Sequence, residues 1–169
     1  MTAQAYLLHD TSGAVFGTGF TPDGTLPDNA IAGTAAQVAA WQGSTVVNDA
    51  IIAPPAPAAP TLAQQAAGLI ASGLTIASTG TPALDGTYAC DSATTDHIQA
   101  EMVAILVTAA FADGTASVAW PDVTGALHTF QSVAAFKAFA VAVAGFVAAG
   151  FKVMNGSSTT LPTATATIA

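Results

Sequence analysis

The segment TDHIQAEMVAILVTAAFA, residues Thr95–Ala112, is the stretch around which the rest of this chain is predicted to fold. Its apolar side chains recur at helical spacing and form two adjoining stripes. The first stripe contains Ile98, Met102, Ile105, Leu106 and Ala109, and the second contains Val103, Val107 and Phe111. Because a helix with two apolar stripes must be covered on most of its sides, we expect a buried central helix.

The polar residues of this segment gather in its first turn and a half. They are Thr95, Asp96, Gln99 and Glu101. At the start of a helix such side chains can cap free amides, and acids oppose the positive end of the helix dipole. We therefore interpret these residues, and His97 with them, as a helix start and not as a chemical site.

The chain is rich in apolar residues and poor in charge. Of its 169 residues 52% are hydrophobic, which is ample material for a core. Ten residues are acidic, arginine is absent, and Lys137 and Lys152 are the only lysines, which gives a formal net charge of −8. Since nucleic acids and anionic membrane surfaces are bound mainly through clustered Lys and Arg, we expect no nucleic-acid partner and no membrane partner.

Only 7% of the residues are charged, whereas about a quarter are charged in an ordinary soluble domain. One explanation is a general bias toward alanine and threonine. The other is that neighbouring copies cover much of the surface, so that solubilising charge is not needed. The second explanation predicts a homo-oligomer, and the two explanations are compatible.

One cysteine and one long apolar run bear on the environment of the chain. Cys90 has no second cysteine to pair with, and we expect it to pack as a small hydrophobic side chain. The first thirty residues lack a basic start followed by an apolar run, so no secretory signal is predicted. The longest uncharged apolar run, Ala138–Phe151, is shorter than a bilayer span, and a buried helix is preferred to a membrane helix.

Residues 1–52 are predicted to form a small β-rich domain. Asp10 opens a turn that Gly13 can close with positive φ, which is typical of a hairpin. The expected elements are a hairpin of Ala5–His9 with Ala14–Phe20, a loop at residues 21–33, a short helix with a capping box from Thr34 to Gln37 and with Val38 and Trp41 facing inward, and one strand at Thr45–Ile52.

Residues 53–60, APPAPAAP, are predicted to be a linker. Proline fixes φ and lacks an amide donor, so this segment should run as an extended, semi-rigid spacer and mark a domain boundary. The alternative is a proline-rich ligand for an aromatic groove, although basic flanking residues are missing.

Residues 61–151 are predicted to form a domain with the order helix, strand, strand, helix, β-hairpin, helix, so the whole chain is of the α+β class. The expected elements are helix Thr61–Ala71, strands Leu74–Ser78 and Thr87–Cys90, the central helix, a hairpin of Ser117–Trp120 with Ala126–Phe130, and helix Gln131–Phe151. The last helix has an aromatic side for the core and an alanine side, which packs either inside the domain or against another subunit. Residues 152–169 form a C-terminal tail that either adds to a neighbour's sheet edge or is disordered.

Several short motifs in this domain resemble a known family. They are Gly73-Leu74-Thr75, GTYACDSATTDHIQAEM with Asp91 before the central helix, and VAWPDVTGALHTF with Trp120, Asp122, Gly125 and Thr129. Over residues 61–151 the chain resembles a small domain of unknown function found in tail and tail-fibre-associated proteins of tailed bacteriophages and prophages. It departs from that family in lacking the arginines and lysines usually found along these helices, where Lys137 and Lys152 are its only basic residues of these two types. The resemblance implies a virion or tail component, and it brings no catalytic residues.

A search for catalytic, cofactor-binding and metal-binding residues assigns none. His9 and His97 each adjoin an aspartate, but sequence neighbours point in different directions. His128 and Asp122 could meet across the end of the second hairpin. The sequence has no Gly-x-Ser-x-Gly elbow, no histidine with a second metal ligand at helical spacing, and no phosphate-binding glycine motif.

Three classes of function remain, and we favour a non-enzymatic structural component of a bacteriophage particle. It would belong to the tail, baseplate or a fibre, with a capsid decoration protein as an alternative. Such a protein is made in the bacterial host cytoplasm, resides in the virion, and binds copies of itself and other phage structural proteins. A host-surface or carbohydrate-binding module would need exposed aromatic residues, for which Trp41, Tyr88 and Trp120 are the candidates. A small enzyme is the third class, but no catalytic constellation supports it.

Overall fold

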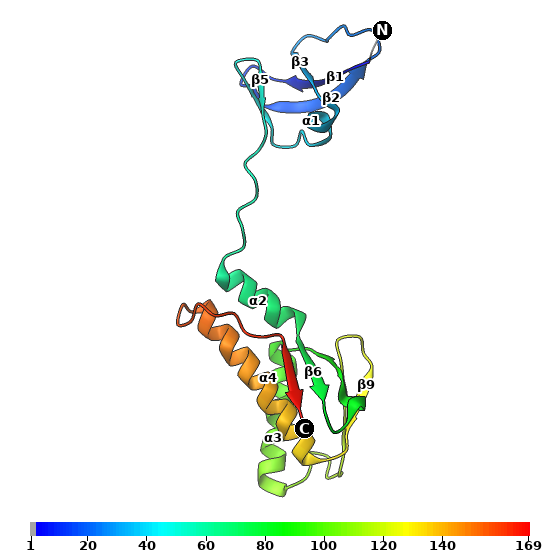
Figure 1. Cartoon of the computed structure of the whole chain (residues 1–169), viewed down its shortest axis with the longest axis vertical. Helices are drawn as coiled ribbons and strands as arrows, with labels where there is room; N and C mark the ends of the chain where they lie inside the picture. Colours follow the sequence, from blue (N-terminus) through cyan, green and yellow to red (C-terminus); the bar gives the residue numbers. More distant parts are fainter. Residues whose placement is uncertain (1–2) are drawn as a thin grey trace. The chain divides into compact units, whose positions relative to one another are not determined.

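The computed structural model describes residues 3–169, which fold into two compact units. The first unit extends to residue 58 and the second comprises residues 59–169, so the chain divides within the proline-rich segment 53–60. That segment is exposed and contains no helix or strand, as its prolines predicted (Figure 1). Helices and strands are both present, and the fold is α+β, as predicted.

The first unit consists of short strands and one short helix. Its elements are β1 Gln4–His9, β2 Val15–Thr21, β3 Ala30–Gly33, α1 Ala35–Ala39, β4 Thr45–Val47 and β5 Ala50–Ile52. β1 lies at the centre of an antiparallel sheet of order β2-β1-β3, and β4 and β5 form a separate hairpin. The predicted hairpin of β1 with β2 is confirmed, with a register shift between Leu8 and His9.

Two parts of this unit differ from the prediction. β3 lies in residues 21–33, which were predicted to be loop, because it pairs with β1 from a distant part of the sequence. The predicted single strand Thr45–Ile52 is a hairpin. Asn48 and Asp49 both adopt positive φ, 49° and 59°, and turn the chain back on itself.

Helix α1 begins as predicted but contributes little to the core. The Thr34 hydroxyl accepts a hydrogen bond from the Gln37 amide, and the Gln37 side chain accepts one from the Thr34 amide. Val38 and Trp41 are half-buried. Among the described residues of this unit, the buried hydrophobic ones are Ala5, Leu7 and Val46.

The second unit combines three helices, a small sheet and a hairpin. Its elements are α2 Leu62–Ser72, β6 Leu74–Ser78, the 3-10 helix η1 Pro82–Leu84, β7 Gly86–Tyr88, α3 Ser92–Thr108, β8 Val118–Pro121, β9 Leu127–Phe130, α4 Val133–Met154 and β10 Thr165–Ile168. The sheet has the order β10-β6-β7, and β8 pairs with β9. The Val123 amide of the β8–β9 turn donates to the Thr87 carbonyl at 2.8 Å and joins the hairpin to β7.

The core of this unit is built around aromatic rings. Phe136 and Phe139 of α4 are fully buried, and the Phe130 ring centroid lies 5.3 and 5.0 Å from theirs. Tyr88 and Trp120 lie 4.8 and 6.3 Å from the Phe139 ring. The aromatic side of the last helix therefore lies in the core, as predicted, and such pairs stabilise it beyond the area they bury.

The ends of the central helix differ from those predicted. Asp91 is its N-cap and accepts a hydrogen bond from the Thr94 amide at 2.7 Å, so Thr95 and Asp96 lie inside the helix. The helix ends before the predicted Ala112, because Ala109 adopts the left-handed conformation with a φ of 59°.

The prediction that this helix is covered on most of its sides was wrong. Ile98 and Ile105 are buried, but Val103, Leu106 and Val107 are 59%, 73% and 80% exposed. Periodicity places both stripes on the helix but does not say which one a neighbouring element covers. One side of α3 therefore packs on the core, and the other side is open.

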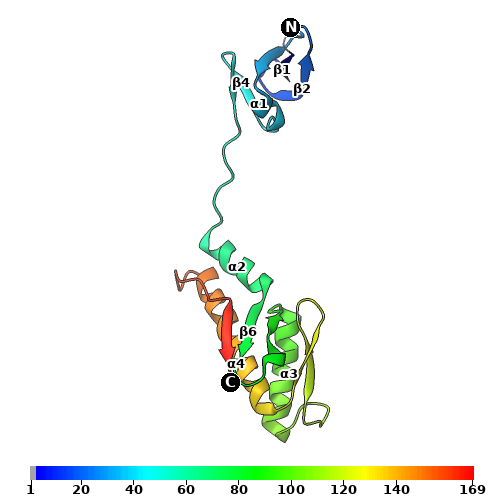
Figure 2. The same cartoon turned by 45° about the vertical axis from the view of Figure 1, so that its right-hand side comes forward.

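The C-terminal tail is an integral strand of the second unit, contrary to both predicted alternatives. β10 pairs in parallel with β6, with Thr165 opposite Thr75 and Ile168 opposite Ser78 (Figure 2). Thr165 and Thr167 are exposed, whereas Ile168 is buried. The alternating sequence of the tail thus forms the edge strand of the β10-β6-β7 sheet in its own chain.

Helix α4 is half-buried. Among the described residues it is the one helix long and apolar enough to cross a membrane, judged by length and composition alone. Phe139, Val143 and Phe146 pack into the core, whereas Val141 and Ala148 on other sides of the helix are exposed. The helix that was expected to be buried is therefore buried on one side only.

Candidate functional site

A groove lined mainly by apolar side chains runs between α3 and α4 in the second unit. Thr95, Ile98 and Gln99 line it from α3, and Ala140, Val143, Ala144, Val147, Ala148 and Phe151 line it from α4. Its volume is about 290 Å³, and no residue that lines it is ionisable. Such a groove can accept an apolar side chain, but it offers no group for acid–base chemistry.

Exposed apolar side chains continue the groove along both helices. Val103 and Leu106 follow Gln99 at i+4 and i+7 and therefore lie on the same side of α3. On α4, Phe151 is 57% exposed. We call this surface the α3–α4 face; it consists of the groove together with Val103, Leu106 and Val107.

The sequence reading missed this face because it assigned both stripes of the central helix to the core. A signal was nevertheless present. The low charged fraction of 7% had already indicated that neighbouring copies could cover part of the surface. Exposed apolar surface of this kind is typical of an interaction site.

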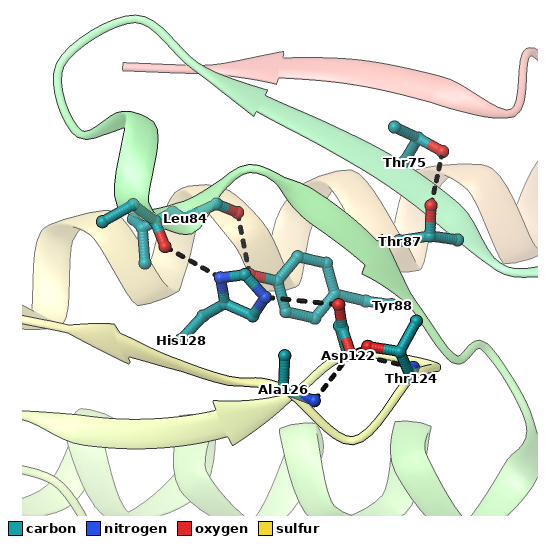
Figure 3. A network of polar contacts seen from close by, with 9 residues as sticks. Thr75, Leu84, Thr87, Tyr88, Asp122, Thr124, Ala126 and His128 are labelled. Atoms are coloured by element: carbon teal, nitrogen blue, oxygen red, sulfur yellow. Dashed lines mark hydrogen bonds and ion pairs between the residues drawn. The ribbon is translucent and has the colours of Figure 1, made fainter.

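A polar cluster joins the second hairpin to the rest of the unit (Figure 3). His128 Nδ1 lies 2.8 Å from the Ala83 carbonyl oxygen, and His128 Nε2 lies 3.4 Å from Asp122 Oδ2. The meeting of His128 and Asp122 was predicted from the hairpin. Behind them the Tyr88 hydroxyl donates to the Leu84 carbonyl at 2.8 Å, and the Tyr88 ring meets the imidazole edge-on at 5.5 Å.

The contacts of this cluster hold the hairpin against the rest of the unit. We call the cluster of Asp122, Thr124, His128 and Tyr88 the clasp. Asp122 Oδ1 accepts hydrogen bonds from the Thr124 amide, the Thr124 hydroxyl and the Ala126 amide at 2.8, 2.7 and 2.9 Å. A hydrolytic relay needs one imidazole nitrogen for the carboxylate and the other for a nucleophile. In His128 one nitrogen faces Asp122 and the other faces a backbone carbonyl, so neither is left for a nucleophile.

Two groups in the clasp have shifted pKa values. The Thr124 hydroxyl, assisted by the amides of Thr124 and Ala126 and by His128, lowers the pKa of Asp122 from 3.8 to about 2. Burial raises the pKa of Tyr88 to about 12, and the carboxylates of Asp122 and Asp85 add to this effect. Near neutral pH Asp122 is therefore ionised and Tyr88 is neutral, which suits a fixed contact.

The other histidines lie apart from this clasp. His9 belongs to the first unit, and His97 lies on α3 beside a shallow groove shared with Asp91 and Asp122. Within residues 3–169 no group of three or more His, Cys, Asp or Glu side chains could hold a metal ion. Cys90 is buried, as predicted, and burial raises its pKa.

The aromatic residues considered for ligand binding lie mostly inside the protein. Tyr88 and Trp120 are buried in the core of the second unit, and Trp41 is half-buried. Phe16 and Phe20 on β2 are instead 60% and 61% exposed, which the sequence reading did not single out. The three named candidates therefore do not form an exposed aromatic cluster.

A comparison with protein-family models, curated proteins and solved structures gave no match. The second unit has two distinctive features, a polar clasp whose groups are all engaged and an open apolar face on two helices.

Proposed function

We propose that this chain is a non-enzymatic structural component of a bacteriophage particle, in the tail, baseplate or a fibre, and that it acts through oligomeric assembly. The α3–α4 face carries the proposal. Leu106 and Val107 expose most of their apolar surface, and the groove between the two helices contains no ionisable residue. Burying such an apolar surface against another protein lowers the free energy in water.

The motifs that resemble the phage tail-associated domain give separate support. Asp91 caps α3 three residues after the end of β7, Trp120 lies on β8, and Gly125 closes the β8–β9 turn with a φ of 86°. These three motif residues thus each have a defined structural position in the second unit, whereas Thr129 lies within β9 and the cap of α4 is Ser132. This is expected of a domain whose recurring residues maintain a scaffold and do not perform chemistry.

The two-unit construction also suits a particle component. Each unit is compact, and the proline-rich residues 53–60 between them fix φ at several positions. A semi-rigid spacer lets one unit be built into an assembly while the other contacts a different protein. The partners in this proposal are copies of the chain and other structural proteins of the particle.

Mass spectrometry and electron microscopy of purified phage particles test the proposal. We expect the chain in many copies at a symmetric position of the tail, baseplate or fibre. Density at capsid lattice positions would instead support the decoration protein. Absence of the chain from purified particles would reject both.

A further inference from the structure

We propose that the α3–α4 face binds the same face of a second copy of this chain in a two-fold symmetric pair. The inference rests on the proposed structural role, and it names the surface and the partner through which the chain assembles. A two-fold contact requires a surface that is complementary to itself. The shape, charge and size of the α3–α4 face each meet this requirement.

The shape of the face allows a side chain of each copy to fill the groove of the other copy. Phe151 is 57% exposed on the α4 side of the groove, and Thr95, Ile98 and Gln99 line the α3 side. A two-fold axis parallel to the helices keeps each residue at its level along them. It therefore places Phe151 of each copy over the α3 side of the groove in the other, and about 290 Å³ is available for the ring.

The charges of the two helices are complementary. Both lysines of the chain, Lys137 and Lys152, lie on α4, which has no acidic residue, whereas α3 has no lysine or arginine and exposes Asp96. The other acid of α3, Glu101, is engaged by the Ala112 amide at 2.9 Å and takes no part in this contact. In the part of the chain that the structure describes, neither lysine forms a salt bridge. The same two-fold axis places α4 of one copy over α3 of the other, with Lys152 opposite Asp96. Pairing two copies therefore brings opposite charges together around a neutral centre.

The size of the face fits a specific contact. With 17 and 22 residues, α3 and α4 are about 25 and 33 Å long and about 10 Å wide, so side by side they cover about 580 Å² in projection. A standard interface buries about 800 Å² of accessible surface on each partner. Because side chains make the accessible area larger than its projection, this face has the area that a stable pair needs. Val103, Leu106 and Val107 would form its apolar part.

Sedimentation equilibrium of the full chain over a concentration series tests the pair. We expect a dimer, and we expect Leu106→Glu to raise its dissociation constant about tenfold or more, because the contact would bury an unpaired charge. The matched control is Leu127→Glu on β9, which is 69% exposed and lies outside the face, against 73% for Leu106. A monomeric wild-type chain, a dimer that tolerates Leu106→Glu, or equal weakening by the control would each overturn the inference.

A charge reversal gives a second test that does not depend on the apolar contact. Asp96→Lys and Lys152→Asp should each weaken the dimer about two- to fivefold, and the double variant should restore the wild-type constant. Additive weakening in the double variant would contradict the proposed orientation. Circular dichroism of each variant checks that the fold is unchanged.

The outcomes separate this inference from the proposed function. A chain that is present in particles but remains monomeric in solution would keep the structural role and reject this pair. A chain that dimerises through α3 and α4 but is absent from particles would keep the pair and reject the role.

Discussion

The two units contain the same turn in different surroundings. Asp10-Thr-Ser-Gly-Ala14 joins β1 to β2, and Asp122-Val-Thr-Gly-Ala126 joins β8 to β9. In both turns the aspartate accepts hydrogen bonds from the amide and hydroxyl two residues on and from the amide four residues on. Both glycines have a φ of 86°. Local sequence therefore determines the turn by itself, wherever it lies in the chain.

The surroundings of the two turns are where the units differ. The second turn is held by His128 and by a hydrogen bond to β7, over a core of fully buried aromatic rings. The first unit buries Ala5, Leu7 and Val46 and leaves Phe16 and Phe20 largely exposed. Since stability depends mainly on buried apolar area, we expect the second unit to be much the more stable of the two.

The largest effect is expected in the core of the second unit, which the pair Ile105→Asp and Leu106→Glu tests. Ile105 is 2% exposed, so a charge there should cost more than about 4 kcal/mol and unfold the second unit. Leu106→Glu lies one residue away on the exposed side and should leave the fold intact. Thermal unfolding by circular dichroism and hydrogen exchange would measure both. A folded Ile105→Asp protein would contradict the assigned core.

The elements that were predicted correctly from the sequence depend on local contacts, and those that were missed depend on distant ones. The capping box at Thr61, the strand Leu74–Ser78 and the Asp10 and Asp122 turns depend on residues close in sequence, and the structure has them all. β3 and β10 were missed because each is a strand only through pairing with a partner far away in the chain.

The candidate surface was missed for a related reason. Hydrophobic periodicity shows that Ile105 and Leu106 are both apolar, but only the packed fold shows that Ile105 is covered and Leu106 is not. The clasp was within reach of the sequence, because a hairpin turn brings His128 back toward Asp122 by itself. Its bond to the Ala83 carbonyl was not, since it joins the hairpin to a segment 45 residues away.

A second prediction tests the distant contact made by the tail. Ile168 is 5% exposed on β10, and Ile168→Ala should reduce the free energy of unfolding of the second unit by about 2–5 kcal/mol. The neighbouring Thr167 is exposed, and Thr167→Ala should change it by less than about 0.5 kcal/mol. Urea titrations of the two variants give both values. Equal effects would mean that the tail is not part of the core.

A third prediction compares the glycines of the two turns. Alanine at either position must adopt the left-handed conformation, which costs about 1–2 kcal/mol. A Cβ on Gly125 meets nothing within 4 Å, whereas a Cβ on Gly13 would overlap the backbone carbonyl of Val46. We therefore expect Gly13→Ala to cost about 2–4 kcal/mol and Gly125→Ala about 1–2 kcal/mol, measured as loss of stability of the respective unit. Equal losses of stability in the two variants would show that the Val46 carbonyl of β4 does not restrict the side chain at position 13.

The last prediction compares the two aspartates by their response to acid. The pKa of Asp122 is lowered from 3.8 to about 2, first by the Thr124 hydroxyl and with help from His128. A lowered pKa means that the ionised side chain stabilises the folded state above pH 3.8 and that this contribution is lost as the pH falls through about 2. Above pH 3.8 the free energy of unfolding of Asp122→Asn should therefore be lower than that of the wild type. This difference should shrink as the pH falls from 3.8 toward about 2.

The first turn provides the matched variant for this measurement. The pKa of Asp10 is also lowered, first by the Ser12 hydroxyl, but no histidine contacts its carboxylate. Asp10→Asn should therefore show the same direction of pH dependence with a smaller amplitude, in the first unit only. Urea titrations between acid and neutral pH in a Trp41→Phe background, where Trp120 reports the second unit, isolate the Asp122 effect. An Asp122→Asn difference that persists below its folded pKa would show that the side chain acts through its shape and that the charge facing His128 contributes nothing.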